Sequence, residues 1–162
     1  MLQTRLSRRH WATWALGGLA SSLSVAVQAT PVLPTPESLP AALADAQQRK
    51  QPLVVMVSLH GCAFCKVVRE SYLFPLMQAG LPVVQVNMRD HHALTDWDGT
   101  ATTQDAWVRK LGITLAPTVL FFGAQGREVA ARLKGAYLPD FYNAYLEEQL
   151  AVARRVVQGG GA

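Results

Sequence analysis

The chain is divided into segments that follow two different hydrophobic patterns. Short continuous apolar runs bounded by Pro, Gly or polar residues predict buried strands, whereas apolar residues repeated every three or four positions predict amphipathic helices. The segments that predict strands are 53–59, 82–88, 118–122 and 127–133. The segments that predict helices are 37–50, 66–73, 104–111 and 138–157.

The order of these elements predicts an α/β fold. A helix separates the first two strands, so these strands are expected to be parallel. The last two strands, 118–122 and 127–133, are joined by a Gly-containing turn, which predicts an antiparallel hairpin. A mixed β-sheet flanked by helices on both faces buries all of these apolar surfaces.

Two segments have a less regular pattern. The helix that starts at residue 66 is expected to end near Leu73, because Pro75 lacks a backbone N–H and disfavours helix at the residue before it. Alternatively, Pro75 opens a short second turn through Ala79. Residues 90–103 are polar and are predicted to be irregular; a connection of this length indicates a functional segment or a surface excursion.

The first 29 residues have the pattern of an export signal. Three arginines precede an uncharged, mostly apolar stretch, 11–27, and residues 27–29 fit a signal-peptidase site. Residues 7–11, Ser-Arg-Arg-His-Trp, also resemble a twin-arginine signal, and either route leads to the periplasm. The alternative is a membrane anchor, which the glycines and serines of this stretch disfavour.

Composition and charge describe one globular domain. Of 162 residues, 50% are hydrophobic and 16% are charged, which excludes a disordered chain. The net charge of +4 is concentrated in the N-terminal arginines, so the rest is nearly neutral and no nucleic-acid binding is expected. The predicted organisation is a signal peptide at 1–29, an extended Pro-rich linker at 30–36, a domain at 37–157 and a flexible tail at 158–162.

The chain contains two cysteines, Cys62 and Cys65, and they lie where the first strand gives way to a helix. This C-x-x-C pair predicts reversible dithiol–disulfide chemistry. Two alternatives remain. The first is that the pair is only a structural disulfide, although the disulfide of such a short loop adds little stability. The second is a non-enzymatic metal-binding or protein-binding (chaperone) module in which His60 and both cysteines are the ligands.

Together these features resemble the thioredoxin superfamily over residues 37–157. They are a C-x-x-C that opens a helix after a buried strand, and Ala116-Pro117-Thr118 at the start of a later hairpin. Residues 95–99 and 113–118 also resemble those of exported thioredoxin-like proteins found with sulfur-oxidation systems. The resemblance implies a thioredoxin-like fold and thiol:disulfide oxidoreductase activity, acting as a reductant.

The resemblance also implies roles for single residues. Cys62 at the helix N-terminus is expected to be the attacking thiolate, since unpaired N–H groups face it, and Cys65 the resolving thiol. Pro117 is expected to follow a cis peptide bond, with Ala116 backbone groups pairing with an extended substrate. The residues expected to bind substrate are Gly61, Phe64, Ala116 and Pro117.

Other positions either tune the pair or depart from the family. His60 and Lys66 are candidates for tuning Cys62, and each is alternatively a solvated surface residue. Many relatives have a tryptophan where Gly61 stands and Gly-Pro between the cysteines. Many also have a buried acid where Met56 stands, so the usual proton acceptor for Cys65 is missing.

The expected partners follow from the same resemblance. They are thiols and disulfides of periplasmic proteins, together with a membrane protein that donates reducing equivalents. No cofactor is expected beyond the Cys62–Cys65 disulfide. No metal is expected either, because His91 and His92 lack further ligands at fixed spacing. The protein is expected to be a monomer.

Overall fold

The computed structural model describes residues 31–136 and 139–159, so the predicted signal segment at 1–29 lies outside the described residues. The strands are β1 Leu53–Ser58, β2 Val83–Asn87, β3 Ala93–Thr95, β4 Ala101–Thr103, β5 Thr118–Phe122 and β6 Leu133–Lys134. The helices are α1 Leu39–Gln48, α2 Ala63–Val67, α3 Phe74–Gln78, α4 Gln104–Lys110 and α5 Pro139–Gln158.

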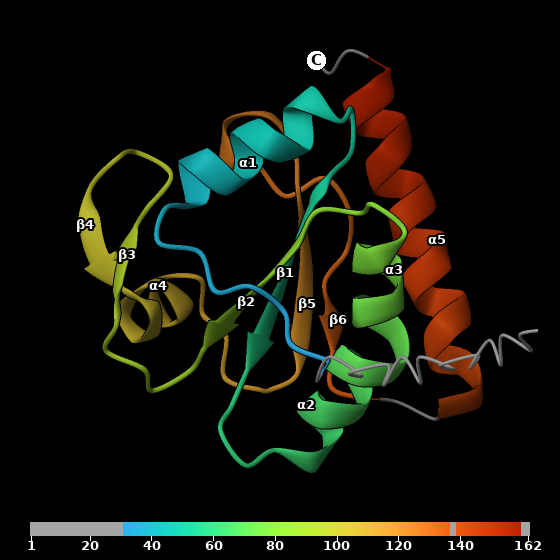
Figure 1. Ribbon diagram of the computed structural model, residues 1–162, viewed down its shortest axis with the longest axis horizontal. Helices are drawn as coiled ribbons and strands as arrows, with labels where there is room; N and C mark the ends of the chain where they lie inside the picture. The colour runs from blue at the N-terminus through green and yellow to red at the C-terminus, as the bar shows by residue number, and fades with distance from the viewer. Residues whose placement is uncertain (1–30, 137–138, 160–162) are drawn as a thin grey trace, which may run out of the picture.

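The main sheet has four strands in the order β2-β1-β5-β6 (Figure 1). Strand β1 is parallel to β2, with Ser58 opposite Asn87, and antiparallel to β5, with Val57 opposite Thr118. The carboxyl ends of β1 and β2 and the start of β5 therefore meet at one edge of the sheet. The loop after β1, which carries the cysteine pair, begins at this edge.

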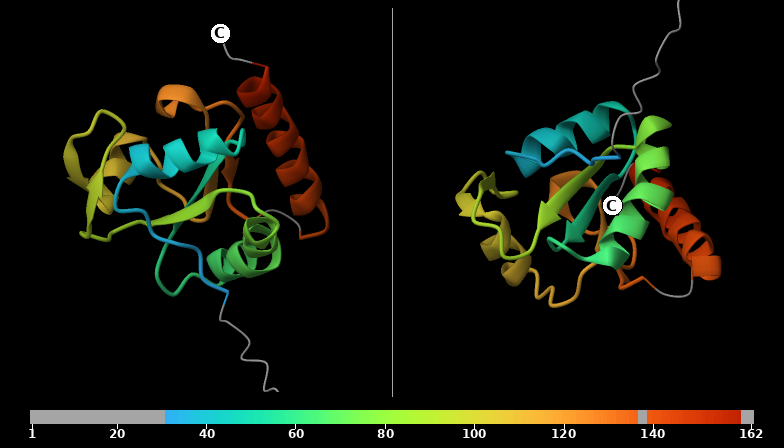
Figure 2. Two further views of the ribbon diagram at one scale, coloured as in Figure 1. Left: turned by 45° about the horizontal axis from the view of Figure 1, so that its top comes forward. Right: turned by 60° about the horizontal axis from the view of Figure 1, so that its bottom comes forward.

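The two faces of the sheet bury separate clusters, because successive side chains of a strand point to opposite faces. On one face Val54 and Met56 of β1 pack with α5 and with the helix that begins at Ala63. On the other face Val55 and Val57 pack with α1 and α4. Helices thus cover both faces (Figure 2), which confirms the predicted α/β fold with a mixed sheet.

The helix after the cysteines does not break near Leu73, as the first interpretation of the sequence expected. A π-helical segment, Val68–Leu73, joins α2 directly to α3, and Leu73 and Phe74 both have helical backbone angles. Pro75 lies in the first turn of α3, and the backbone stays helical through it although Pro75 has no N–H to donate to the preceding turn. The alternative of a short second helical turn is therefore confirmed, and Gly80 ends it at a φ of 97°.

Residues 90–103 are only partly irregular: β3 and β4 form an antiparallel ribbon, with Leu94 opposite Thr102, and the remaining residues lie in loops and turns. The sequence did not predict these strands because one face of the ribbon lies toward solvent and its residues are polar. It is anchored at Leu94, which is 2% exposed.

The predicted strand at 127–133 is also wrong in extent, since the regular strand is β6 alone. Val129 still donates its N–H to Phe121 of β5 at 2.9 Å. Ala131, however, donates its N–H to the Gln149 side chain of α5 at 3.0 Å. A side chain on a neighbouring helix thus takes the hydrogen bond that a regular strand would have given to β5.

The segment predicted as an extended linker, 30–36, has no regular helix or strand where the structure describes it, and it packs on the domain. Leu33 is 2% exposed, and Pro34 accepts a hydrogen bond from the Gln85 N–H at 2.8 Å. At the other end, α5 continues through Gln158, one residue into the predicted tail. Among the helices at 31–136 and 139–159, none combines the length and the apolarity needed to cross a membrane.

Candidate active site

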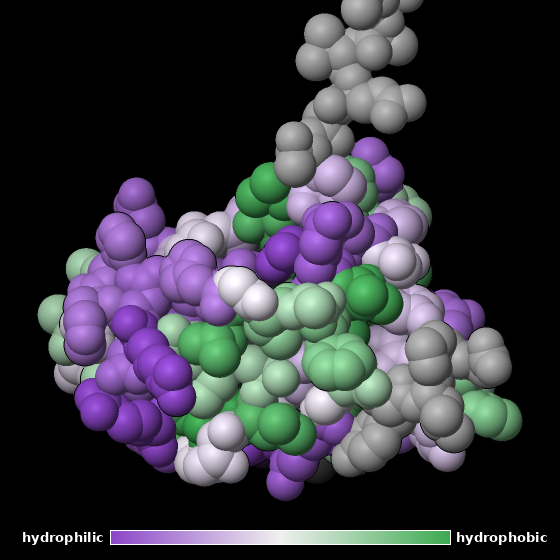
Figure 3. Space-filling model, turned by 90° about the horizontal axis from the view of Figure 1, so that it is seen from below, coloured by the Kyte–Doolittle hydropathy of each residue, from purple (hydrophilic) through white to green (hydrophobic). Residues whose placement is uncertain are grey.

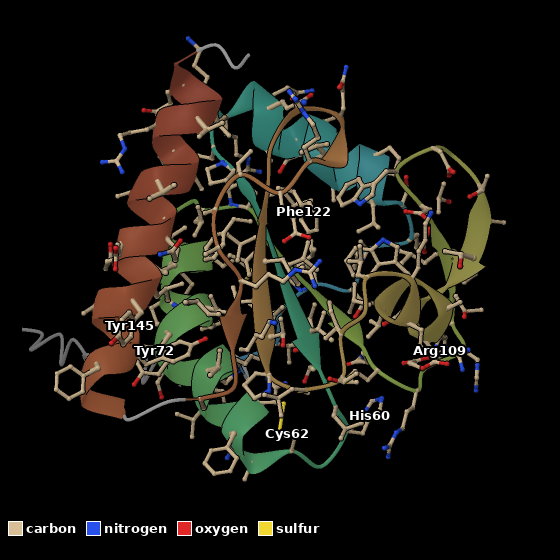
Figure 4. The ribbon with its side chains drawn as sticks, turned by 180° about the vertical axis from the view of Figure 1, so that it is seen from behind. His60, Cys62, Tyr72, Arg109, Phe122 and Tyr145 are labelled. Atoms are coloured by element: carbon tan, nitrogen blue, oxygen red, sulfur yellow. A yellow bond between two sulfur atoms is a disulfide. The ribbon has the colours of Figure 1, made fainter. Side chains whose placement is uncertain are left out.

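The cysteine turn is built by the end of β1 and the start of α2. Gly61 has a φ of 74°, a left-handed conformation that side chains with a Cβ adopt at a cost. This turn brings the Cys62 N–H to within 3.2 Å of the Leu59 carbonyl oxygen and starts the helix at Ala63. Cys62 and Cys65 are joined by a disulfide, with their Cα atoms 5.2 Å apart (Figure 4).

Cys62 is the N-cap residue of α2. Its Sγ accepts a hydrogen bond from the Cys65 N–H at 3.1 Å, so it takes one of the donors that a helix N-terminus leaves unpaired. No acidic residue lies in the first turn of α2. When the disulfide is reduced, this N–H group and the positive end of the helix would stabilise a negative charge on Cys62 Sγ.

The two sulfurs have very different surroundings. Cys62 is partly exposed at the surface, whereas Cys65 is 1% exposed. Cys65 belongs to the apolar cluster that also contains Met56, which is fully buried. Met56 thus shares the cluster of Cys65, and its thioether side chain cannot serve as a proton acceptor.

Ala116 and Pro117 lie on the β5 side of the disulfide. The Ala116–Pro117 peptide bond is cis, the configuration expected from the sequence. The Ala116 carbonyl oxygen is 4.0 Å from Cys62 Sγ, although 54 positions separate the two residues in sequence. The Pro117 carbonyl oxygen accepts the Gly135 N–H at 2.7 Å, which holds this loop against β6.

The two candidate tuning residues have partners other than Cys62. Lys66 Nζ is 3.8 Å from a Glu70 carboxylate oxygen, one helical turn along, and 67% of its side chain is exposed. His60 Nε2 is 3.7 Å from Asp90 Oδ2, and its side chain is also largely exposed. Both residues are close in sequence to the disulfide, but neither of these ion pairs involves it.

In the His60–Asp90 ion pair, Asp90 is held by further hydrogen bonds. Its Oδ1 accepts the His92 backbone N–H at 2.9 Å and also contacts the His92 ring. These hydrogen bonds, the backbone one first, hold the pKa of Asp90 below its usual range despite partial burial. His91 and His92 are both exposed.

Large apolar side chains are exposed on the segments that adjoin the disulfide and Ala116 in sequence. Phe64 is 65% exposed, and Val67 and Leu115 are also among the exposed large apolar residues. Figure 3, which views the molecule from the end that carries Cys62, shows apolar side chains gathered on this face and hydrophilic ones beside them. Of the predicted substrate-binding residues, Gly61 and Phe64 are exposed and Ala116 is partly exposed, so an extended apolar segment can contact them, whereas Pro117 is buried.

A polar pocket on the β2 side of Cys62 was missed by the sequence analysis. Its lining includes Cys62, Lys66, Arg69, Gln85 and Asn87. A signal for it exists in the sequence, because Gln85 and Asn87 are polar residues two positions apart in an otherwise apolar strand and so share one face. What the sequence does not indicate is that Arg69 reaches this face.

Comparison with known families decides the assignment of the chain. The model of the thioredoxin-like domain family matches residues 39–150. The chain belongs to this family. The match includes both cysteines and Pro117, so it spans the whole site described above.

Two solved structures illustrate the fold of this thioredoxin-like domain. A thioredoxin from Thermus thermophilus is 22% identical, with 81% of this chain and 92% of that one covered and a TM-score of 0.50. The oxidoreductase DsbH is 19% identical, with 78% and 93% covered and a TM-score of 0.51. At these identities the likeness concerns the fold alone. No curated protein matches the chain.

Within the described part of this thioredoxin-like domain, no group of three or more His, Cys, Asp or Glu side chains is placed to hold a metal ion.

Proposed function

We propose that this protein is an exported thiol:disulfide oxidoreductase that reduces disulfides of periplasmic proteins through Cys62 and Cys65. The observation that carries the proposal is the unequal placement of the two sulfurs. Cys62 is accessible and caps a helix, whereas Cys65 is buried directly behind it. An exposed attacking sulfur and a shielded resolving sulfur are what a two-step exchange needs.

The exchange conserves atoms and electrons. The Cys62 thiolate attacks one sulfur of the substrate disulfide, the substrate S–S bond breaks, and one substrate thiolate leaves. Cys65 then gives its proton to the substrate thiolate released first and attacks Cys62 Sγ, which releases the second substrate sulfur as a thiolate. Two electrons pass to the substrate, and the domain is left as the Cys62–Cys65 disulfide.

Each cycle ends with the oxidised domain, so a dithiol donor has to reduce it again. A membrane protein that passes reducing equivalents outward is the class of donor proposed here. Export is supported by the signal pattern of residues 1–29. Substrate docking beside Cys62 is supported by Ala116, whose carbonyl group lies against the sulfur, and by the exposed ring of Phe64.

The test is covalent trapping in the periplasm. Cys65→Ala, expressed with residues 1–29 intact, cannot resolve mixed disulfides, so substrate and donor stay attached to Cys62. The matched control is the double variant Cys62→Ser/Cys65→Ala. In vitro, Cys62→Ser is expected to lose insulin disulfide reduction completely. Full activity of Cys62→Ser, or equal capture by the double variant, would refute the proposal.

A further inference from the structure

The polar pocket beside Cys62 is not used by the exchange described above. It has a volume of about 270 Å³ and is open to solvent. Its lining comes from the loop after β1, from the first turns of the helix and from two side chains of β2. Because β2 and β5 flank β1 on opposite sides, the pocket and Ala116 lie on opposite sides of the Cys62 turn.

The charge of the pocket is positive. Lys66 and Arg69 both line it, and in the described part of the chain no carboxylate does. Lys66 forms a surface ion pair with Glu70, which is a weak interaction in water. The cationic groups of the pocket therefore lack a strong anionic partner from its lining.

Arg69 is held in place by neutral groups. It is half-buried, and its Nη1 donates to Gln85 Oε1 at 3.1 Å. Gln85 Nε2 in turn donates to Asn87 Oδ1 at 2.9 Å. This bond uses one of the five N–H donors of the guanidinium, and it orients the group without neutralising its charge.

We propose that this pocket is a substrate subsite for a carboxylate that lies next to the disulfide being reduced. The inference rests on the proposed function, since the occupant is part of the disulfide substrate. A substrate that runs from Ala116 across Cys62 would continue into the pocket. The planar guanidinium of Arg69 matches a carboxylate in two parallel hydrogen bonds, and Lys66 adds a second positive charge.

Two sources can supply this carboxylate. One is an acidic residue next to a cysteine in a protein, and the other is a small carboxylated disulfide such as glutathione disulfide. The subsite is chemically the same in both cases. The test below therefore includes one arm for each source.

The test measures how fast the reduced protein reacts with matched peptide disulfides. Three peptides differ only in carrying Glu, Gln or Lys next to the cysteine. The Glu peptide is expected to react about tenfold faster than the Gln peptide, the change that one hydrogen bond to a charged group commonly makes. The Lys peptide is expected to be slower than both. Raising the ionic strength should narrow the Glu/Gln ratio in the unmodified protein.

The variant that tests the pocket is Arg69→Gln, and its matched control is Arg155→Gln. Arg155 lies in the last turn of α5, at the end of the helix far from Cys62 (Figure 4). Both variants remove one positive charge. Arg69→Gln is expected to bring the Glu/Gln ratio close to one, whereas Arg155→Gln leaves it unchanged. Using the ratio cancels any effect of Arg69 on the Cys62 thiolate, because that effect slows all peptides alike.

Glutathione disulfide and its carboxyl-esterified form provide the second arm. If the free acid is favoured and Arg69→Gln abolishes the preference, the subsite accepts a small molecule. A preference confined to the peptides assigns it to acidic protein segments. Equal rates for the Glu and Gln peptides, or the same loss of preference in Arg155→Gln, would overturn the inference while exchange itself continues. Absence of exchange with every disulfide would instead refute the proposed function.

Discussion

Met56 offers a direct test of how the surroundings of Cys65 are built. Met56 is 0% exposed and belongs to the apolar cluster that contains Cys65. Replacing it by Asp places a carboxyl group in that cluster. Met56→Asn is the matched control, because it has nearly the same size and polarity as Asp but does not titrate near neutral pH.

The expected size of the effect follows from burial. An Asp in an unfolded chain has a pKa of about 3.9, and burial in an apolar cluster raises it by about 3. Each unit corresponds to about 1.36 kcal/mol, so the variant should lose ~4 kcal/mol of its free energy of unfolding over the whole titration, and ~3 kcal/mol of this between pH 4 and pH 7. Because the pKa of this acid is higher in the folded state, the free energy of unfolding decreases as pH rises. The folded state keeps the proton, so stability is present below the unfolded pKa and falls as pH rises toward the folded one.

The assay is urea denaturation of the oxidised variants across this pH range. Both variants are expected to be less stable than the unmodified protein at pH 4, by ~2–5 kcal/mol, because a buried methionine is lost. Only Met56→Asp should lose further stability toward pH 7. The same pH profile for Asp and Asn would mean that water or a cationic group reaches position 56, which would refute the argument that Cys65 lies in an apolar site without a proton acceptor.

Two further stability measurements test other parts of the structure. Gly126→Ala is expected to lower the free energy of unfolding by ~3 kcal/mol, because φ is 67° and the new Cβ would overlap the Trp97 indole. This indole packs against the Phe122 ring, with the ring centroids 4.8 Å apart. The matched control is Gly99→Ala, which has a φ of 83° but open space around it and should lose only ~1 kcal/mol. Asp90 has a lowered pKa, so its contribution is present above about pH 4 and is lost as pH falls through the folded value. Asp90→Asn should therefore flatten the loss of stability in acid.

Equal losses of stability in the two glycine variants would contradict the first prediction, since the Trp97 indole would then move aside freely. The second fails if the Asn variant and the unmodified protein unfold in acid with the same pH dependence. Both can be followed by urea denaturation with far-ultraviolet circular dichroism.

The elements that the sequence predicted well are those with an unambiguous hydrophobic pattern. Strand β5 was predicted with its observed bounds, and β1 and β2 within two residues at each end, because both faces of these strands are buried. Helix α4 was predicted to within one residue, since Thr103 caps its start and Gly112 follows its end at a φ of 66°. Local patterns of this kind depend on neighbours in sequence, which are all visible without the structure.

The π-helical segment, the β3–β4 ribbon and the short β6 depend on distant partners instead. The Gln149 side chain on α5 accepts a hydrogen bond from the Ala131 N–H, and no local feature of residues 127–133 predicts this contact. The ribbon forms because Leu94 finds a buried place beside α1, β2 and α4. Hydrogen bonds and burial offered by other elements override local propensity in these segments.

The features of the site also fall into those that the sequence predicted and those that depend on tertiary structure. The sequence alone determined that a C-x-x-C pair follows a buried strand and opens a helix, and that Met56 replaces an acid. Only the tertiary structure decided that Cys65 is 1% exposed while Cys62 is accessible, and that Ala116 lies against Cys62. Only the tertiary structure brought Arg69 to Gln85, because a helix and a strand must pack before their side chains share one pocket. Spacing in sequence determines the order of such groups, whereas packing determines which of them meet.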